Sequence, residues 1–127
     1  MVTDLCSMRT LIVELKEVEQ YLKKSFDLSL NEALCLCHCD EGHTEPHKIS
    51  SELELSPSRL SRILESLEQK SVVTRTISPT DRRTIVVKLT DKGTSLVRQL
   101  HQSTLPLPSY LTKAIQIIKT ADKKGEK

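Results

Sequence analysis

The chain has 127 residues, 37% of them hydrophobic but only 2% aromatic, and a formal net charge of +2. This length suits one domain whose core needs no disulfide bonds, and so few aromatic side chains argue against a single-stranded nucleic-acid site built on base stacking. No run is long and apolar enough to cross a membrane, and the N-terminus lacks the basic-then-apolar order of a signal peptide, so we expect a cytoplasmic protein.

The charge is unevenly distributed along the chain. Residues 56–98 contain nine Lys and Arg against four Asp and Glu, a net charge of +5, whereas residues 1–55 contain five against eleven, a net charge of −6. A basic segment that follows an acidic one is typical of a protein that binds a polyanion. Plain solvation of a charged surface is the alternative explanation.

The N-terminal half predicts three helices. Apolar residues spaced three and four apart predict an amphipathic helix over 3–24. Ser29 and Glu32 have the spacing of a capping box, so a second helix should begin just after Ser29. It should end before a connector over 42–46, which leaves room for at most a two- or three-residue strand, and a short third helix should span 47–53.

A further helix is predicted over 56–70. Ser56 can accept hydrogen bonds from the first turn, and Pro57 at the first helical position loses no backbone bond. The apolar stripe of this helix is Leu60, Ile63, Leu64 and Leu67. Off that stripe, in the first two turns, lie Ser58, Arg59, Ser61 and Arg62. A short helix, a tight turn and a second helix with Arg and Ser near its start form the pattern of a helix-turn-helix.

The segment after this helix predicts a β-hairpin. Residues 72–77 and 84–89 are rich in Val, Ile and Thr, which favour strands. The intervening Ser-Pro-Thr-Asp sequence is typical of a turn, and it is followed by the adjacent pair Arg82 and Arg83. We therefore expect a hairpin with a basic tip, which is the wing of a winged helix.

Two helices are predicted for the C-terminal part. Thr90 is expected to cap a helix that runs to about residue 103. The segment 105–108 must interrupt the helical pattern because it contains two prolines. A final helix should begin near Ser109, and residues 122–127 form a charged tail whose end should fray.

Four short segments, read in this order, resemble the MarR family of bacterial transcription regulators. They are LSPSRLSR at 55–62, LEQKSVVTR at 67–75, DRR at 81–83 and LTDKG at 89–93. The resemblance implies a mainly α fold with a small β-hairpin wing, a winged helix-turn-helix with flanking N- and C-terminal dimerisation helices. One domain would cover 1–127, with 30–89 binding DNA and with 3–24 and 90–119 forming the helical dimerisation region.

The resemblance also implies partners and residue roles. The protein would be a homodimeric transcription regulator that binds double-stranded DNA, and we expect it to be a repressor. A small-molecule effector is a further partner that the resemblance allows. Asp81 would brace the wing while Arg82 or Arg83 reaches the minor groove. Family members often have Gly where this chain has Glu54 and Ser71, and both positions are expected to need a left-handed backbone.

The polar face of the 56–70 helix supplies the other candidate DNA contacts. Arg59 and Arg62 can read guanine or bind phosphate, and the sequence does not separate these two roles. Ser56, Ser58 and Ser61 are expected to touch phosphate or to cap the helix. One of the two wing arginines could instead pair with Asp81.

The second predicted helix and the connector after it contain a cluster of cysteine and histidine residues. The candidate ligands or redox groups are Cys35, His38, Cys39, His43 and His47. Their spacing would allow Zn²⁺ binding but matches no common zinc finger, and helical cysteines are often small buried hydrophobes. We expect no resident cofactor, with zinc as the possible exception.

Cys6 in the first helix is a separate candidate, because some MarR-like regulators sense peroxide through a cysteine there. Such a role requires a thiol with a low pKa.

Other classes of function remain as alternatives. The sequence has no Gly-rich phosphate loop, nucleophile elbow or HExxH motif, so we do not expect an enzyme. A metal-responsive regulator that uses the Cys/His cluster is one alternative. A winged helix that binds only other proteins is another, and it would tolerate loss of the arginines.

Overall fold

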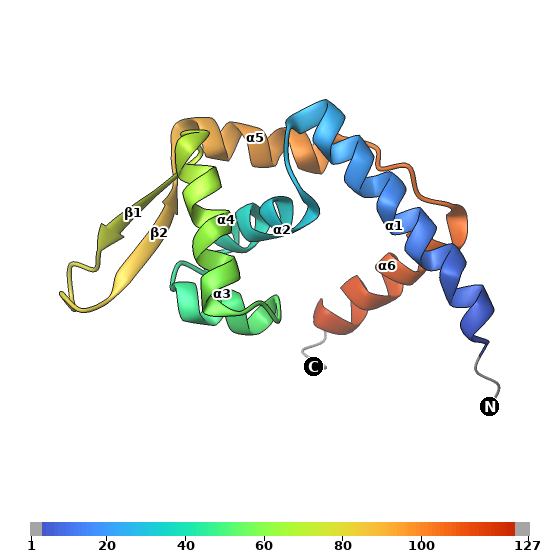
Figure 1. Cartoon of the computed structure of the whole chain (residues 1–127), viewed down its shortest axis with the longest axis horizontal. Coiled ribbons are helices and arrows are strands. Elements are labelled where there is room, and N and C mark those ends of the chain that lie inside the picture. Colours follow the sequence, from blue (N-terminus) through green and yellow to red (C-terminus); the bar gives the residue numbers. More distant parts are fainter. Residues whose placement is uncertain (1–3, 124–127) are drawn as a thin grey trace. The chain divides into compact units, whose positions relative to one another are not determined.

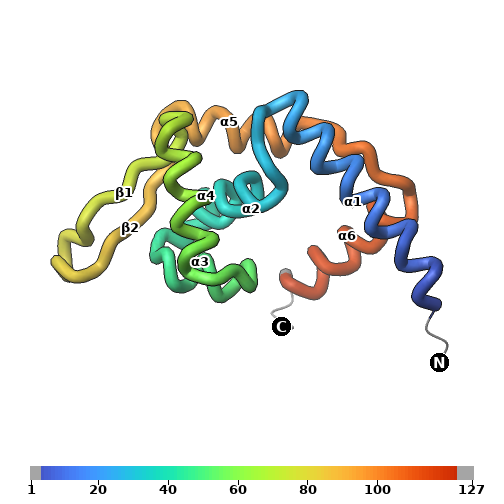
Figure 2. The backbone as a smooth tube through the Cα atoms, in the orientation of Figure 1, coloured from blue at the N-terminus to red at the C-terminus, as the bar shows by residue number. Residues whose placement is uncertain are grey.

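The structure, a computed structural model, describes residues 4–123. Its helices and strands, in chain order, are α1 (Leu5–Phe26), α2 (Leu30–Asp40), α3 (Pro46–Glu52), α4 (Pro57–Gln69), β1 (Val73–Ile77), β2 (Ile85–Leu89), α5 (Asp91–Gln102) and α6 (Ser109–Lys123) (Figure 1). The backbone forms two compact units (Figure 2). Residues 22–103 make the winged-helix unit, and residues 4–21 together with residues 104–123 make the terminal unit.

The predicted fold class is confirmed, because the chain is mainly helical with one two-stranded antiparallel hairpin. The element bounds differ from the predicted ones by a few residues. The first helix extends to Phe26, and the third helix already includes Pro46. Thr3, the expected start of the first helix, and residues 124–127 of the predicted tail lie outside the described residues.

Side chains cap the helices where the sequence predicts. Ser29 accepts a hydrogen bond from the backbone N–H of Glu32, and the Glu32 carboxylate accepts one from the N–H of Ser29. This pair completes the predicted capping box before α2. Ser56 and Thr90 accept a bond from the third residue of α4 and α5 in the same way. These caps fix where each helix of the winged-helix unit begins.

Three consecutive helices end in the same backbone motif. A left-handed residue follows α2, α3 and α4, namely Gly42 at φ 98°, Glu54 at φ 53° and Ser71 at φ 63°. After each of them, the next N–H donates to the carbonyl five residues earlier, which defines a Schellman motif. The left-handed backbone expected at Glu54 and Ser71 is therefore confirmed. Each side chain there costs roughly 1 kcal/mol relative to glycine.

The core of the winged-helix unit contains side chains from its helices and from the base of the hairpin. The largest fully buried ones are Leu28, Cys35, Leu36, Ile49, Leu60, Leu64, Leu67, Val72, Val87 and Val97. Gly93, in the first turn of α5, packs directly against the chain at the start of β1. A Cβ atom there would lie 2.0 Å from the carbonyl oxygen of Val72, so this contact requires glycine.

The hairpin pairs β1 with β2 in antiparallel register, from Val73 opposite Leu89 to Ile77 opposite Ile85. The connector before α3 contains no strand within the described residues, although the sequence left room for one. Instead, the carbonyl of Thr44 accepts a single hydrogen bond of 2.8 Å from the N–H of Val87. This bond attaches the hairpin base to the connector.

The terminal unit leaves many large apolar side chains exposed. On α1 they are Leu5, Met8, Leu11, Ile12, Val13 and Leu15, and on α6 they are Tyr110, Ile115, Ile117 and Ile118. Exposed apolar residues in such number are typical of an interaction surface. Within residues 4–123, none of the helices combines the length and the apolar character that crossing a membrane requires.

Candidate nucleic-acid interface

Helix α4 separates its apolar and polar residues onto different faces. Leu60, Leu64 and Leu67 are buried and Ile63 is half-buried, so the predicted stripe does hold the helix in the core. The polar residues of the first two turns are all exposed, namely Ser58, Arg59, Ser61 and Arg62. Ser56 is also exposed, and its hydroxyl is used as the N-cap of α4. The helix therefore presents two arginines and three hydroxyls to solvent near its N-terminus.

Two ion pairs hold the C-terminal part of α4. Nζ of Lys70 lies 3.1 Å from Oε1 of Glu32 at the start of α2. Arg75 on β1 contacts Glu68 of α4 through Nη2 at 2.6 Å and Nε at 2.8 Å. These pairs attach α4 to α2 and to the hairpin, which fixes the orientation of its exposed face. Neither pair was predicted from the sequence.

The tip of the wing is organised by Asp81. Its Oδ1 accepts the backbone N–H of Arg83 at 3.0 Å, and its Oδ2 accepts the hydroxyl of Thr84 at 2.9 Å. These two hydrogen bonds lower the pKa of Asp81, so the carboxylate stays ionised. The hairpin extends away from the helices of its own unit (Figure 1), and Arg82 and Arg83 are exposed at its end.

The four candidate arginines share one property. Within residues 4–123, the guanidinium groups of Arg59, Arg62, Arg82 and Arg83 have no ion pair or hydrogen bond. The Asp81 carboxylate binds the backbone of Arg83 and the side chain of Thr84, so the alternative in which it pairs with a wing guanidinium is not observed. Arg75, by contrast, is neutralised by Glu68. Unpaired arginines give the exposed side of α4 and the wing tip positive charge that is available to a polyanion.

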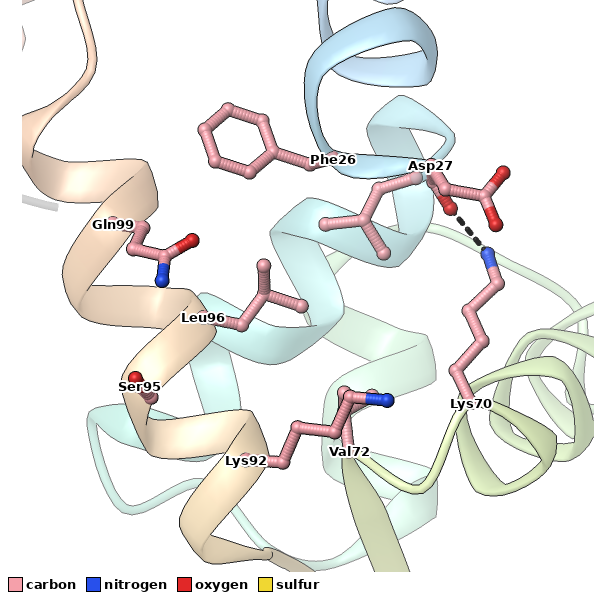
Figure 3. Close-up of a pocket in the computed structure, with 9 residues that line it drawn as sticks. Phe26, Asp27, Lys70, Val72, Lys92, Ser95, Leu96 and Gln99 are labelled. Carbon is pink, nitrogen blue, oxygen red and sulfur yellow. Dashed lines mark hydrogen bonds between the residues drawn. The ribbon is translucent and has the colours of Figure 1, made fainter.

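A cavity of about 380 Å³ lies beside the start of α5 (Figure 3). Its lining residues are Phe26, Asp27, Leu28, Lys70, Val72, Lys92, Ser95, Leu96 and Gln99. Lys70 donates a hydrogen bond to the carbonyl of Asp27, whereas the ammonium of Lys92 has no partner within residues 4–123. The cavity has the size of a small-molecule site, and it was not predicted from the sequence.

The cysteines of α2 occupy different environments. Cys35 and Cys39 are buried core residues, and a hydrogen bond to Cys39 together with burial raises the pKa of the Cys35 thiol. Cys37 is half-buried with its Sγ 3.8 Å from Nε2 of His101. Burial, followed by the nearby charges of Glu41 and Asp40, raises the pKa of Cys37. Cys35 and Cys39 are thus buried and Cys37 is half-buried, whereas Cys6 on α1 is exposed.

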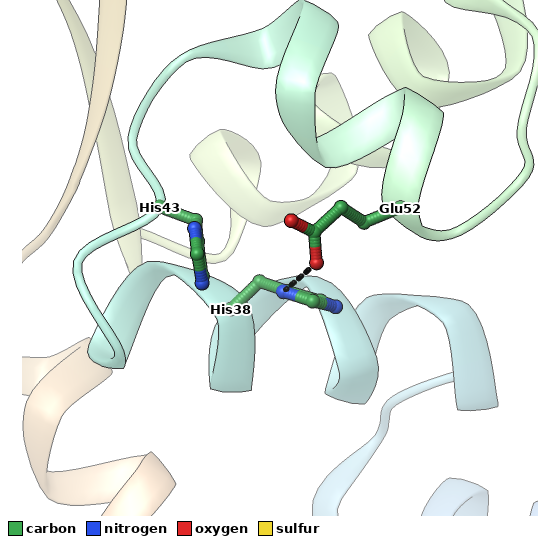
Figure 4. A group of neighbouring side chains, drawn as sticks. All are labelled: His38, His43 and Glu52. Carbon is green, nitrogen blue, oxygen red and sulfur yellow. Dashed lines mark ion pairs between the residues drawn. The ribbon is translucent and has the colours of Figure 1, made fainter. Parts of the chain in front are cut away.

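The histidines of the same region separate from the cysteines. His38 and His43 lie beside Glu52, and one ligand atom from each of the three lies within 4.8 Å of the others (Figure 4). His47 is instead exposed and has its Nε2 3.7 Å from a carboxylate oxygen of Glu45. Glu52 was not a candidate in the sequence because it comes from a different helix, α3, and only the fold brings its carboxylate near the histidines.

Comparisons with known proteins agree with this geometry. The family model described as "Transcriptional regulator SarA/Rot" matches residues 9–100. The HTH-type transcriptional regulator YhbI of Bacillus subtilis (strain 168) is 25% identical over 92 residues, which are 72% of this chain. The matched region spans only 60% of the length of YhbI.

Solved structures of regulators share the fold. The wild-type apo form of MarR from E. coli is 25% identical, with 80% of this chain and 76% of that chain covered at a TM-score of 0.68. A mutant MarR from E. coli complexed with operator DNA is also 25% identical, with 79% and 78% covered at a TM-score of 0.64.

Proposed function

The chain belongs to the SarA/Rot family of transcriptional regulators, and on that premise we propose that it represses transcription as a homodimer bound to a pseudo-palindromic operator. The family consists of DNA-binding regulators of the MarR structural type rather than enzymes. The observation that carries the proposal is the set of four unpaired guanidinium groups on α4 and at the wing tip. A winged helix that bound only other proteins would have no need of them.

The two pairs of arginines suit two different grooves. The N-terminal residues of a recognition helix lie in the major groove, where Arg59 and Arg62 can donate to guanine or to phosphate. A narrow A·T-rich minor groove attracts arginine, which suits Arg82 or Arg83 at the end of the extended wing. We therefore expect each subunit to read one half-site, with the half-sites about one helical turn apart.

The terminal unit supports the dimeric part of the proposal. Its exposed apolar residues on α1 and α6 would be removed from water by a second copy of the chain. A two-fold dimer uses the same surface of both subunits, so one apolar surface is sufficient.

Selection of bound sequences from a random pool of double-stranded DNA tests the proposal. Pseudo-palindromic sequences are expected, and affinity for the selected site should then be compared with affinity for random DNA. Arg62→Ala should weaken specific binding more than non-specific binding. Arg98→Ala removes an equal charge at an exposed position of α5 and should change both affinities little. Equal losses of specific and non-specific binding in Arg62→Ala would contradict a base-reading role.

Repression itself requires a separate measurement. The selected operator should be placed across a promoter, and transcript should be counted in a purified transcription reaction with increasing protein. Less transcript is expected, and more transcript would identify an activator.

A small anionic molecule is the effector that the cavity of Figure 3 supports. Lys92 supplies an unneutralised ammonium group beside the apolar side chains of Phe26 and Leu96. Aromatic carboxylates such as salicylate are suitable probes, and Lys92→Ala should abolish any shift that they cause in the unfolding temperature.

Oxidation is the second route of release that we propose, and it would act through Cys6 because this thiol is exposed. Peroxide should lower operator affinity in the wild type and not in Cys6→Ser. The enclosed thiols of α2 should not contribute.

A further inference from the structure

The end of α2 places two imidazoles side by side. In its Schellman motif, the N–H of His43 donates to the carbonyl of His38 at 3.0 Å, and the N–H of Gly42 donates to that of Cys39 at 3.1 Å. The first and last residues of this motif usually make an apolar contact. Here both are histidines, and their ring centroids are 5.4 Å apart at an angle of 65°.

Glu52, the last residue of α3, completes a group of three. Its Oε2 lies 3.9 Å from Nδ1 of His38, which is too long for a hydrogen bond. Nδ1 of His38 is buried and has no hydrogen-bond partner within residues 4–123. A buried ring nitrogen without a partner is uncommon, and here it faces a carboxylate and a second imidazole (Figure 4).

We propose that His38, His43 and Glu52 bind a divalent transition-metal ion, with Zn²⁺ as the best match. Two imidazole nitrogens and one carboxylate oxygen are a known zinc donor set, with water in the fourth position. Ligands about 2.0–2.2 Å from one ion lie about 3.3–3.6 Å apart in a tetrahedral site, so the present separations of up to 4.8 Å must shorten. The Glu52 side chain, which is 41% exposed, is free to make this adjustment.

The site excludes the thiols of the same helix. Cys35 and Cys39 are enclosed in the core, and Cys37 faces His101. The proposed ligands are therefore nitrogen and oxygen only, unlike a cysteine-rich zinc finger. This inference does not rest on the proposed function, since the three residues could hold a metal ion whether or not the protein represses transcription.

Titration of the full-length chain with Zn²⁺ and with Co²⁺ tests the proposal without DNA. One ion per subunit should bind, and the Co²⁺ complex should show visible d–d bands without a thiolate charge-transfer band. His43→Ala and Glu52→Gln should each weaken binding by about tenfold or more, which is the lower range of what metal sites lose when a supporting residue is removed. His47→Ala and Cys37→Ser serve as matched controls and should bind as the wild type does.

Folding of each variant is checked by thermal unfolding without metal. At one Zn²⁺ concentration, the unfolding temperature should rise in the wild type and in both controls, and it should rise less in His43→Ala. Equal Zn²⁺ affinity in the wild type and in both ligand variants would overturn the proposal. A thiolate charge-transfer band that disappears in Cys37→Ser would also overturn it, because the metal would then be held by the cysteines.

Discussion

The hydroxyl of Ser66 donates a hydrogen bond of 2.6 Å to Oε2 of Glu32, which joins α4 to the first turn of α2. Glu32 is buried, and the same carboxylate accepts bonds from the N–H of Ser29 at 2.8 Å and from Lys70 at 3.1 Å. One side chain thus caps α2 and also holds α4. The exposed arginines of α4 depend on this attachment for their orientation.

Removing the Glu32 carboxylate should be costly. Glu32→Ala deletes the capping box, removes the acceptor of the Ser66 hydroxyl and leaves Lys70 with only the carbonyl of Asp27, so we expect a loss of about 2–4 kcal/mol in the free energy of unfolding. Ser66→Ala removes one hydrogen bond to a charged group and should cost about 1–2 kcal/mol. Urea unfolding measures both losses. Glu65→Ala, at an exposed position of α4, should change the free energy of unfolding little. A neutral Glu32→Ala would show that the network does not hold the helix.

The same carboxylate should make stability depend on pH. Burial alone would raise the pKa of Glu32, but the hydrogen bonds from Ser66, from the N–H of Ser29 and from Lys70 lower it overall. Because its pKa is lower in the folded than in the unfolded protein, its contribution is full at neutral pH and is lost as the pH falls through the acidic range below about pH 4.

Glu32→Gln, which can keep the capping box, tests this dependence. The difference in unfolding free energy between the wild type and Glu32→Gln should shrink as the pH falls. Glu65→Gln should show a constant difference, and so would Glu32→Gln if the carboxylate of Glu32 were unimportant.

Gly93 should not tolerate a side chain. The Cβ atom of Gly93→Ala would overlap the backbone carbonyl of Val72, which cannot rotate away, so we expect at least about 3 kcal/mol of destabilisation. Gly42→Ala has open space but a φ of 98°, and it should cost only about 1 kcal/mol. Thermal unfolding compares the two, and similar costs would contradict the close approach of α5 to β1.

At the ends of α3 and α4, substitution by glycine should stabilise the fold. Glu54→Gly and Ser71→Gly remove a side chain from a left-handed residue, and each should stabilise the fold by about 0.5–1 kcal/mol after the added flexibility of the unfolded chain is subtracted. Glu65→Gly makes the same change at a helical φ and should destabilise by about 1 kcal/mol. If Glu54→Gly and Ser71→Gly instead destabilised the fold, the contacts of these side chains would stabilise it by more than the left-handed backbone costs.

Local sequence signals predicted the secondary structure well because the helix starts depend on residues within one turn. Ser29, Ser56 and Thr90 are such cases, as is the turn that ends in Asp81. The bond between Ser66 and Glu32 joins residues 34 positions apart, and no local pattern could reveal it. No local pattern could reveal the approach of Glu52 to His38 either, because the two residues belong to different helices.

The contact between His43 and His38 was closer to being predictable. Gly42 after a helix is a common signal for a Schellman motif, and that motif would have placed His43 over His38. The sequence placed Cys35 and Cys39 among the same candidate ligands, whereas burial in the core separates these two thiols from the histidines.

The wing arginines should determine a preference for A·T-rich DNA beside each half-site. An arginine in a narrow minor groove is attracted by its enhanced negative potential, so Arg82→Ala or Arg83→Ala should reduce this preference. In a homodimer, substitution of the arginine that contacts DNA removes two contacts, and the slope of log affinity against log salt should then shrink by about 2. Lys88→Ala, on the exposed side of β2, should keep the preference, and Asp81→Ala should lose it because the tip loses its hydrogen bonds. Fluorescence anisotropy with A·T-rich and G·C-rich flanks measures the effect, and an unchanged preference in the Arg82→Ala, Arg83→Ala double variant would remove the wing from the proposed interface.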